Sequence, residues 1–210
     1  MYDQRVKDGT ELDVTAFLLA GGKSSRMGSD KAFLRFGDEI LLSLTLKAAR
    51  AVAEEVRIVG DAKKFAAFGP VVEDIYRDRG PLGGIHAALS SSPTDLNLML
   101  AVDLPFVDAK FLEYLLLRAR KSSAMVTVAR AGGGLQPLCG VYQHGFVEVA
   151  EQSLRDGKNK IDSLFERIAT CVFEEDELVR AGFSVDMFRN LNTPQELEQA
   201  RSLGSGQGHE

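Results

Sequence analysis

The sequence has few of the residues that build disulfide frameworks and zinc sites. Among its 210 residues are two cysteines, Cys139 and Cys171, and three histidines. Two cysteines so far apart form neither a disulfide framework nor a CxxC metal motif, and scattered histidines supply no zinc motif. We therefore expect a cytoplasmic protein in a reducing compartment.

Long apolar runs are absent as well. No uninterrupted apolar stretch is long enough to span a bilayer, and the first residues, MYDQRVKDGTELD, contain no apolar core of a signal peptide. The sequence thus predicts no membrane segment and no processing. A net charge of -5 and a pI of about 5.4 argue against a protein that coats nucleic acid or anionic membrane. The expected partner is a small molecule.

The residues that are present alternate between strand-like and helix-like patterns. Apolar runs closed by glycine or aspartate indicate buried parallel strands, and apolar residues at helical spacing indicate helices between them. Strands are predicted over residues 14–20, 56–60, 70–74, 96–103, 124–129, 135–142 and 169–174. Helices are predicted over residues 41–52, 81–91, 109–120, 146–154 and 161–167, with a closing helix that begins at Thr193-Pro194.

This alternation predicts an α/β protein with a doubly wound, mostly parallel, Rossmann-like sheet in three α/β/α layers. One domain is expected over residues 14–202, with flexible termini at 1–13 and 203–210. The chain after Gly132 departs from simple alternation, which suggests a lid or an acceptor-side region. Ligands of such sheets bind beyond the carboxyl ends of the strands. The loops at 21–31, 60–61, 73–74 and Asp103 should therefore converge.

The loop after the first strand contains Gly22-Lys23-Ser24, the ending of a P-loop. A P-loop also needs a glycine five residues before Gly22, and that position is Phe17, inside the predicted strand. The loop is still suited to phosphate, because residues 23–35 carry four cations and one anion beside glycine-rich backbone. A solvated charged turn is the alternative.

The string LAGGKSSRMGSDK, with GPLGGI, VDLPF and NLNTPQEL downstream, resembles the molybdenum cofactor guanylyltransferases over residues 16–201. The resemblance implies a nucleotidyltransferase fold, Mg²⁺ as cofactor, and transfer of GMP from GTP to the phosphate of molybdopterin. It also implies transient contact with other molybdenum cofactor enzymes. Because cytidylyltransferases share the first motif, a CTP-dependent enzyme remains an alternative. A catalytically inactive nucleotide-binding adaptor or chaperone is another.

Asp103 is the first candidate for catalysis. It ends the apolar run LNLMLAVD, where an unpaired carboxylate is costly to bury, and Mg²⁺ commonly takes one or two carboxylates beside phosphate oxygens. A helix cap is the alternative role. By the resemblance, Asp103 ligates Mg²⁺ and contacts GTP, Lys31 contacts the nucleotide and Arg26 lies over the phosphates. An ordinary surface lysine is the alternative for Lys31.

The resemblance also assigns residues to the nucleotide and the acceptor. Backbone amides around Leu19, Ala20, Gly21 and Gly22 approach the nucleotide, and Asp74 lies near the guanine, where a carboxylate can accept two ring N–H bonds. A loop aspartate that caps a turn is the alternative for Asp74. The acceptor-side candidates are Gly83, Gln136, Asn190 and Asn192. A plain helix start is the alternative for Gly83, and a turn and cap is the alternative for Asn190 and Asn192.

Overall fold

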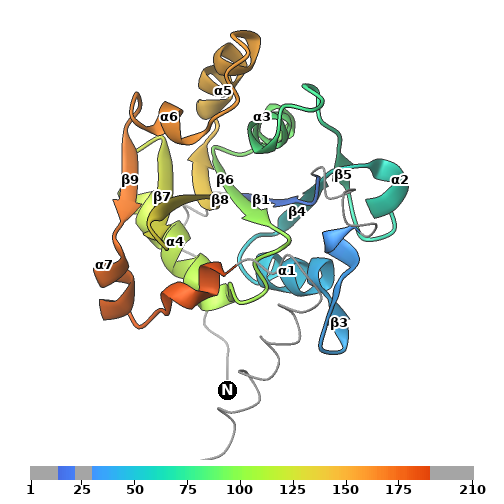
Figure 1. Cartoon of the computed structure of the whole chain (residues 1–210), viewed down its shortest axis with the longest axis horizontal. Coiled ribbons are helices and arrows are strands. Elements are labelled where there is room, and N and C mark those ends of the chain that lie inside the picture. Colours follow the sequence, from blue (N-terminus) through green and yellow to red (C-terminus); the bar gives the residue numbers. More distant parts are fainter. Residues whose placement is uncertain (1–13, 22–29, 190–210) are drawn as a thin grey trace, which may run out of the picture.

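The computed structural model describes residues 14–21 and 30–189. These residues contain a seven-stranded sheet with the strand order β5-β4-β1-β6-β8-β7-β9 (Figure 1). The strands are β1 (Val14–Leu19), β4 (Glu55–Val59), β5 (Val71–Val72), β6 (Leu96–Ala101), β7 (Val126–Ala131), β8 (Gly134–Gln143) and β9 (Thr170–Phe173). A two-stranded hairpin, β2 (Arg35–Phe36) and β3 (Glu39–Ile40), lies apart from this sheet.

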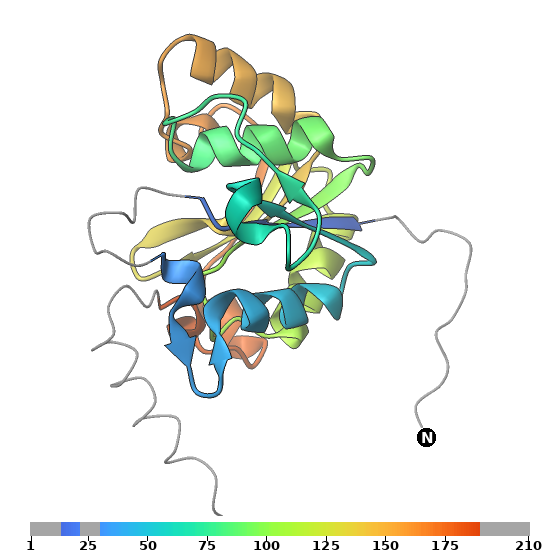
Figure 2. The same ribbon diagram turned by 90° about the vertical axis from the view of Figure 1, so that its right-hand side faces the viewer.

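The helices cover both faces of the sheet. Figure 2 shows α3 and α5 on one side and α1 and α4 on the other. The helices are α1 (Leu41–Arg50), α2 (Ala62–Phe65), α3 (Pro81–Ser91), α4 (Ala109–Lys121), α5 (Phe146–Arg155), α6 (Asp162–Phe165) and α7 (Glu175–Arg180), with the 3₁₀ turns η2 (Lys31–Phe33) and η3 (Val185–Phe188). The predicted three-layer α/β architecture is confirmed.

The central strand β1 lies between β4 and β6, runs parallel to both, and is buried along its whole length. Phe17 and Leu19 point into the core beneath α3, α5 and α6, whereas Ala16 and Leu18 point into the core shared with α1 and α4. Side chains on a strand alternate between faces, so a continuous apolar run supplies both cores.

The sheet is mixed, because β8 runs antiparallel to both β6 and β7. The residues after Gly132 therefore continue into the sheet as a hairpin partner of β7 and do not form a separate lid. Cys139 lies on β8, paired with Leu100 of β6, and burial raises the pKa of its thiol to about 12. The second cysteine, Cys171, lies half-buried on β9.

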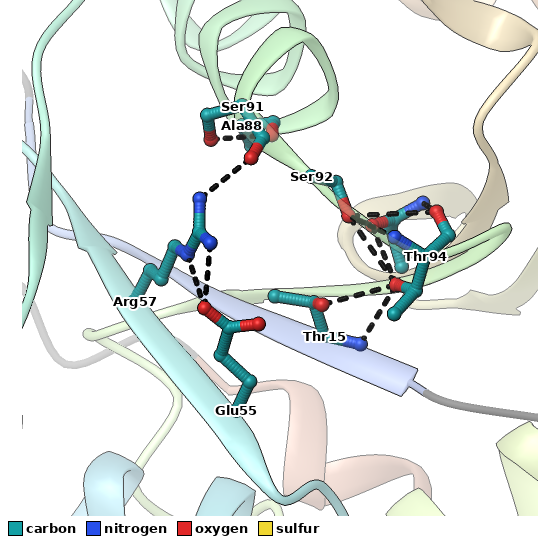
Figure 3. Close-up of polar contacts among 8 residues, drawn as sticks. Thr15, Glu55, Arg57, Ala88, Ser91, Ser92 and Thr94 are labelled. Atoms are coloured by element: carbon teal, nitrogen blue, oxygen red, sulfur yellow. Dashed lines mark hydrogen bonds and ion pairs between the residues drawn. The ribbon is translucent and has the colours of Figure 1, made fainter.

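The edge of the sheet at the amino ends of β1 and β4 holds a polar network that anchors the end of α3 (Figure 3). The Thr94 hydroxyl accepts a hydrogen bond from the Thr15 amide at 3.1 Å and donates one to the Thr15 hydroxyl at 3.0 Å. The Arg57 guanidinium bonds Glu55 at 2.7 Å and the carbonyl of Ser91 at 2.6 Å. A cation is favourable at this helix end, so the contacts hold α3 against the sheet.

Several boundaries differ from those predicted. The third strand is only Val71–Val72, so Glu73 and Asp74 follow it as loop residues. The predicted closing helix at Thr193-Pro194 and the flexible termini lie outside the described residues. No helix within residues 14–21 and 30–189 is long and apolar enough to cross a membrane.

Candidate active site

The loops after β1, β4, β5 and β6 meet at the carboxyl ends of these strands. The amides of Ala20 and Gly21 both donate to the carbonyl of Val59, at 3.0 and 3.1 Å. On the other side of β1, the Val102 amide donates to the carbonyl of Leu19 at 3.4 Å. The end of the first strand is thus fixed to the ends of both neighbouring strands.

These bonds change the expected role of the first loop residues. Leu19 and Ala20 are almost fully buried, and the Ala20 and Gly21 amides are engaged with Val59 rather than pointing at an open site. Gly21 is exposed, so a ligand can approach the chain at this point. Gly22 and Arg26, the other expected phosphate contacts of the loop, lie outside the described residues.

An ion pair between Lys31 and Asp103 is the principal feature of this edge. The ammonium nitrogen of Lys31 lies 3.4 Å from a carboxylate oxygen of Asp103, although the residues are 72 positions apart. Their side chains are 31% and 20% exposed, so a ligand can reach both. Asp103 does not cap the helix that follows, because Asp108 caps α4 by accepting a bond from the Phe111 amide at 2.9 Å.

Lys31 is the first residue of η2, a turn that sequence reasoning did not identify. Asp30 caps this turn through a bond from the Ala32 amide at 3.3 Å, and its second oxygen pairs with the Lys64 ammonium of α2 at 2.9 Å. The Phe33 ring stacks on Phe65 of α2, with centroids 5.6 Å apart. No local pattern links these partners, because they come from two elements that are far apart in the sequence.

Asp74 lies beside the same strand ends. A Cβ built at Gly84 would lie 3.7 Å from a carboxylate oxygen of Asp74 and 3.5 Å from both Leu19 and Val59. Asp74 is partly buried, and the loss of hydration raises the pKa of its carboxyl. No hydrogen bond joins this carboxylate to another described residue, which removes the turn-capping alternative.

The first turn of α3 explains the glycines of GPLGGI. Gly80 has a φ of 65° and precedes Pro81, which takes the first helical position as predicted. Gly83 is buried, and a Cβ there would lie 2.8 Å from the carbonyl oxygen of Tyr76. The Gly83 amide also donates to the Gly80 carbonyl at 3.1 Å. Close packing therefore requires the glycine at this position whether or not a ligand binds.

Of the expected acceptor-side residues, Gln136 lies on β8, before Cys139. Because Cys139 pairs with Leu100 near the end of β6, Gln136 lies beyond that end, on the edge that carries Asp103. Its side-chain amide donates to the carbonyl of Ala131 at 2.9 Å and so closes the β7–β8 hairpin. Asn190 and Asn192 lie outside the described residues.

A resident metal centre is not built into this part of the chain. Within residues 14–21 and 30–189, no three histidine, cysteine, aspartate or glutamate side chains lie close enough together to hold a metal. Asp103 offers a single accessible carboxylate, which suits Mg²⁺ only when further oxygens come from a phosphate ligand. His86 is a buried helix residue, packed edge-on against Tyr76 with ring centroids 5.0 Å apart.

The comparison with protein families identifies this arrangement. Residues 16–171 match the MobA-like NTP transferase domain. The chain belongs to this family. This MobA-like NTP transferase is 32% identical over 196 residues to a protein of Syntrophotalea carbinolica named molybdenum cofactor guanylyltransferase. The match covers 92% of this chain and 93% of the relative.

Solved structures share the fold of this MobA-like NTP transferase. Molybdopterin-guanine dinucleotide biosynthesis protein A from Archaeoglobus fulgidus superposes with a TM-score of 0.78 at 23% identity, covering 91% of this chain and 98% of that one. The 2-C-methyl-D-erythritol 4-phosphate cytidylyltransferase from Thermus thermophilus superposes with a TM-score of 0.65 at 19% identity, covering 90% and 98%. Since the fold is common to proteins named for guanine and for cytidylyl transfer, it does not itself select the base.

Proposed function

We propose that the chain transfers GMP from GTP to the terminal phosphate of molybdopterin and releases pyrophosphate. The Lys31–Asp103 ion pair carries this proposal, because it places an accessible cation and an accessible carboxylate together at the strand ends. Family membership and the name of the Syntrophotalea relative support the choice of reaction. The share of each chain covered, above nine-tenths, favours the same activity for the whole chain.

In the proposed reaction a phosphate oxygen of molybdopterin attacks the α-phosphorus of GTP in line. A new phosphorus–oxygen bond forms, the bond from the α-phosphorus to its bridging oxygen breaks, and pyrophosphate leaves with the electron pair. The protein contributes mainly by holding two anions together and by offsetting the charge on the leaving group. Lys31 would supply part of that positive charge, with Arg26 as a second proposed cation.

Asp103 would hold Mg²⁺ together with oxygens of the triphosphate. The ion would add positive charge beside the phosphate groups, which is the chemistry it supplies in phosphoryl and nucleotidyl transfer. The Asp103 side chain lies 3.4 Å from the Lys31 ammonium and is 20% exposed, so its carboxylate would be accessible to a cation. We propose that the nucleotide lies against Gly21 and Gly22 and against the backbone of Leu19 and Ala20.

Asp74 is the proposed guanine contact. A carboxylate can accept two N–H bonds from the guanine edge, whereas the cytosine edge offers a different pattern of donors and acceptors. The partial burial of Asp74 would strengthen such bonds, because less water competes for the carboxylate. On the acceptor side we propose Gln136, Asn190 and Asn192, with Gly83 in a packing role at the start of α3.

The decisive experiment supplies the purified chain with molybdopterin, Mg²⁺ and either GTP or CTP, and measures pyrophosphate. Release with GTP at least about tenfold faster than with CTP is expected, together with formation of molybdopterin guanine dinucleotide. Faster release with CTP would favour the cytidylyltransferase alternative. Nucleotide binding without any release would favour the adaptor alternative and end the enzymatic proposal.

A further inference from the structure

The turn that carries Lys31 is too short to hold its own orientation. The η2 turn contains three residues, Lys31 to Phe33, and short 3₁₀ segments have little stability without outside contacts. Its own backbone bonds are those of Phe33 and Leu34 to the carbonyls of Asp30 and Lys31, each at 3.0 Å. The direction in which the Lys31 side chain points therefore depends on what the turn packs against.

One contact is the carboxylate of Asp30, which joins the turn to a second element. One oxygen accepts from the Ala32 amide at 3.3 Å, and the other accepts from the Lys64 ammonium at 2.9 Å. The Asp30 side chain is only 17% exposed, whereas that of Lys64 is 51% exposed, so water reaches the cation of this pair. The hydrogen bond and the charge of Asp30 raise the pKa of Lys64.

The second contact is aromatic and involves the same helix. Phe33 stacks on Phe65 with an angle of 18° between the rings, and its centroid lies 5.9 Å from that of Phe68. Phe65 is itself 1% exposed and packs over the end of β4, where a Cβ on Gly60 would come within 2.8 Å of the ring. The α2 segment is thus fixed to the sheet, and the η2 turn is fixed to α2.

We propose that Lys64 is a positioning residue that, through the Asp30 carboxylate, fixes the turn from which Lys31 reaches Asp103. This inference rests on the proposed function, because it assigns Lys64 an effect on the same transfer reaction. Lys64 acts through its pair with Asp30, and its side chain is half exposed. An exposed ion pair contributes little to overall stability, so its loss should alter catalysis and leave unfolding nearly unchanged.

The test compares Lys64→Met with Lys63→Met, which removes the same charge from the adjacent position of the same helix. We expect Lys64→Met to lower kcat/KM for GTP about tenfold, since small displacements of a charged group near the reacting atoms have large effects. Lys63→Met should stay within about twofold of wild type, and Lys64→Arg should restore most of the activity. The unfolding midpoints of all three variants should agree.

The link through Lys31 is tested in a double-mutant cycle. In a Lys31→Ala background, Lys64→Met should change kcat/KM by less than about twofold, because the group that it positions is gone. An undiminished tenfold drop in that background, or equal effects of Lys64→Met and Lys63→Met, would overturn the inference.

Failure of the proposed function gives a different result, because the wild-type chain would then release no pyrophosphate from GTP. In that case the same variants are compared by their affinity for GTP with Mg²⁺. The coupling between Lys64 and Lys31 is expected there as well, and its absence overturns the positioning role independently of the reaction.

Discussion

At the scale of single residues, the carboxylate of Asp103 has two proposed roles: it pairs with Lys31 and it would hold the cation. It follows the fully buried strand β6, yet its side chain keeps 20% of its surface exposed beside Lys31. We expect Asp103→Asn to lower kcat at least about a hundredfold, because the proposed cation site and the partner of Lys31 are both lost. Pyrophosphate release measures the first effect, and circular dichroism should show an unchanged fold.

The matched control for that prediction is Asp108→Asn, which alters the cap of α4 and leaves the ion pair intact. It should cost about 1 kcal/mol of stability or less, because asparagine also caps helices well, and turnover should stay near the wild-type value. Wild-type rates in Asp103→Asn would remove Asp103 from the mechanism.

The charged carboxylate of Asp74 should lower the stability of the folded chain and favour GTP over CTP. Its folded-state pKa is raised by burial, so the charged form costs folding free energy above that pKa and the cost fades as the pH falls below it. Asp74→Asn is therefore expected to raise the unfolding temperature at neutral pH. The same change should reduce the preference for GTP over CTP by about ten- to a hundredfold.

A pH titration separates these two effects of Asp74. GTP affinity of the wild type should decline as the pH falls through the raised pKa, because the protonated carboxyl no longer accepts two N–H bonds. In Asp74→Asn this decline should be absent. Equal pH profiles for GTP binding in the two proteins would contradict the assigned role.

At the scale of elements, two adjacent glycines in α3 provide a matched pair. Gly83→Ala would bring a methyl group within 2.8 Å of the Tyr76 carbonyl oxygen, so the backbone must move, at a cost of about 1–3 kcal/mol. Gly84→Ala meets only ordinary contacts at 3.5–3.7 Å, and alanine favours a helix by up to about 1 kcal/mol. In denaturant unfolding, the midpoint of Gly83→Ala should lie well below that of Gly84→Ala. Equal midpoints would refute this packing argument.

The contact between α3 and α5 should respond to acid through His86. This side chain is 4% exposed and its Nδ1 has no hydrogen-bond partner among the described residues. Burial lowers its pKa, with Glu151 opposing and Arg155 reinforcing the shift. The unfolded chain therefore takes up a proton that the folded chain refuses, and stability falls as the pH drops below the unfolded value of 6.5.

The slope for one proton, about 1.4 kcal/mol per pH unit, is the upper limit of this loss. His86→Leu, which has a similar volume and no titrating group, should flatten the slope in urea unfolding measured between pH 6.5 and pH 5. An identical acid slope in the variant would show that other groups govern the dependence.

The longer elements could be predicted from sequence, and the short ones could not. The buried strands β1 and β6 and the helices α1, α3 and α4 have apolar runs or periods long enough to indicate them. The α2 helix and the β2–β3 hairpin are stabilised by tertiary contacts, such as Phe65 over Gly60, that no local pattern encodes. Sequence motifs pointed to Asp103 and Lys31 as candidates for the site. No local pattern pointed to the Asp30–Lys64 pair, because it is a tertiary contact.

At the scale of the whole molecule, the strand directions are what the alternation of elements left undetermined. Strand β8 was expected as a strand, but its antiparallel course depends on pairing with β6, nearly 40 residues earlier in the chain. Because β8 runs antiparallel, Gln136 returns to the end of the sheet that carries Asp103. The same strand separates the parallel strands into two groups, with β5, β4, β1 and β6 on one side and β7 and β9 on the other.

Removal of divalent cations should affect activity and leave the folded chain unaltered. The described residues include no cluster of three ligands, so Mg²⁺ is expected to bind with the nucleotide and not with the chain alone. EDTA should abolish pyrophosphate release, and excess Mg²⁺ should restore it. The unfolding temperature of the nucleotide-free protein should not change with EDTA, and a marked decrease would indicate a structural metal instead.

The burial of Cys139 in the middle of the sheet makes the two thiols unequal. A thiol whose pKa is about 12 is almost entirely protonated near neutral pH and shielded from reagents, whereas Cys171 is half-buried near the edge. The sequence contains only these two cysteines. An alkylating reagent therefore distinguishes a chain whose sheet is closed from one whose sheet has opened, by the number of alkyl groups attached to the cysteines. The rate at which the second group is added then measures how often the centre of the sheet opens to solvent.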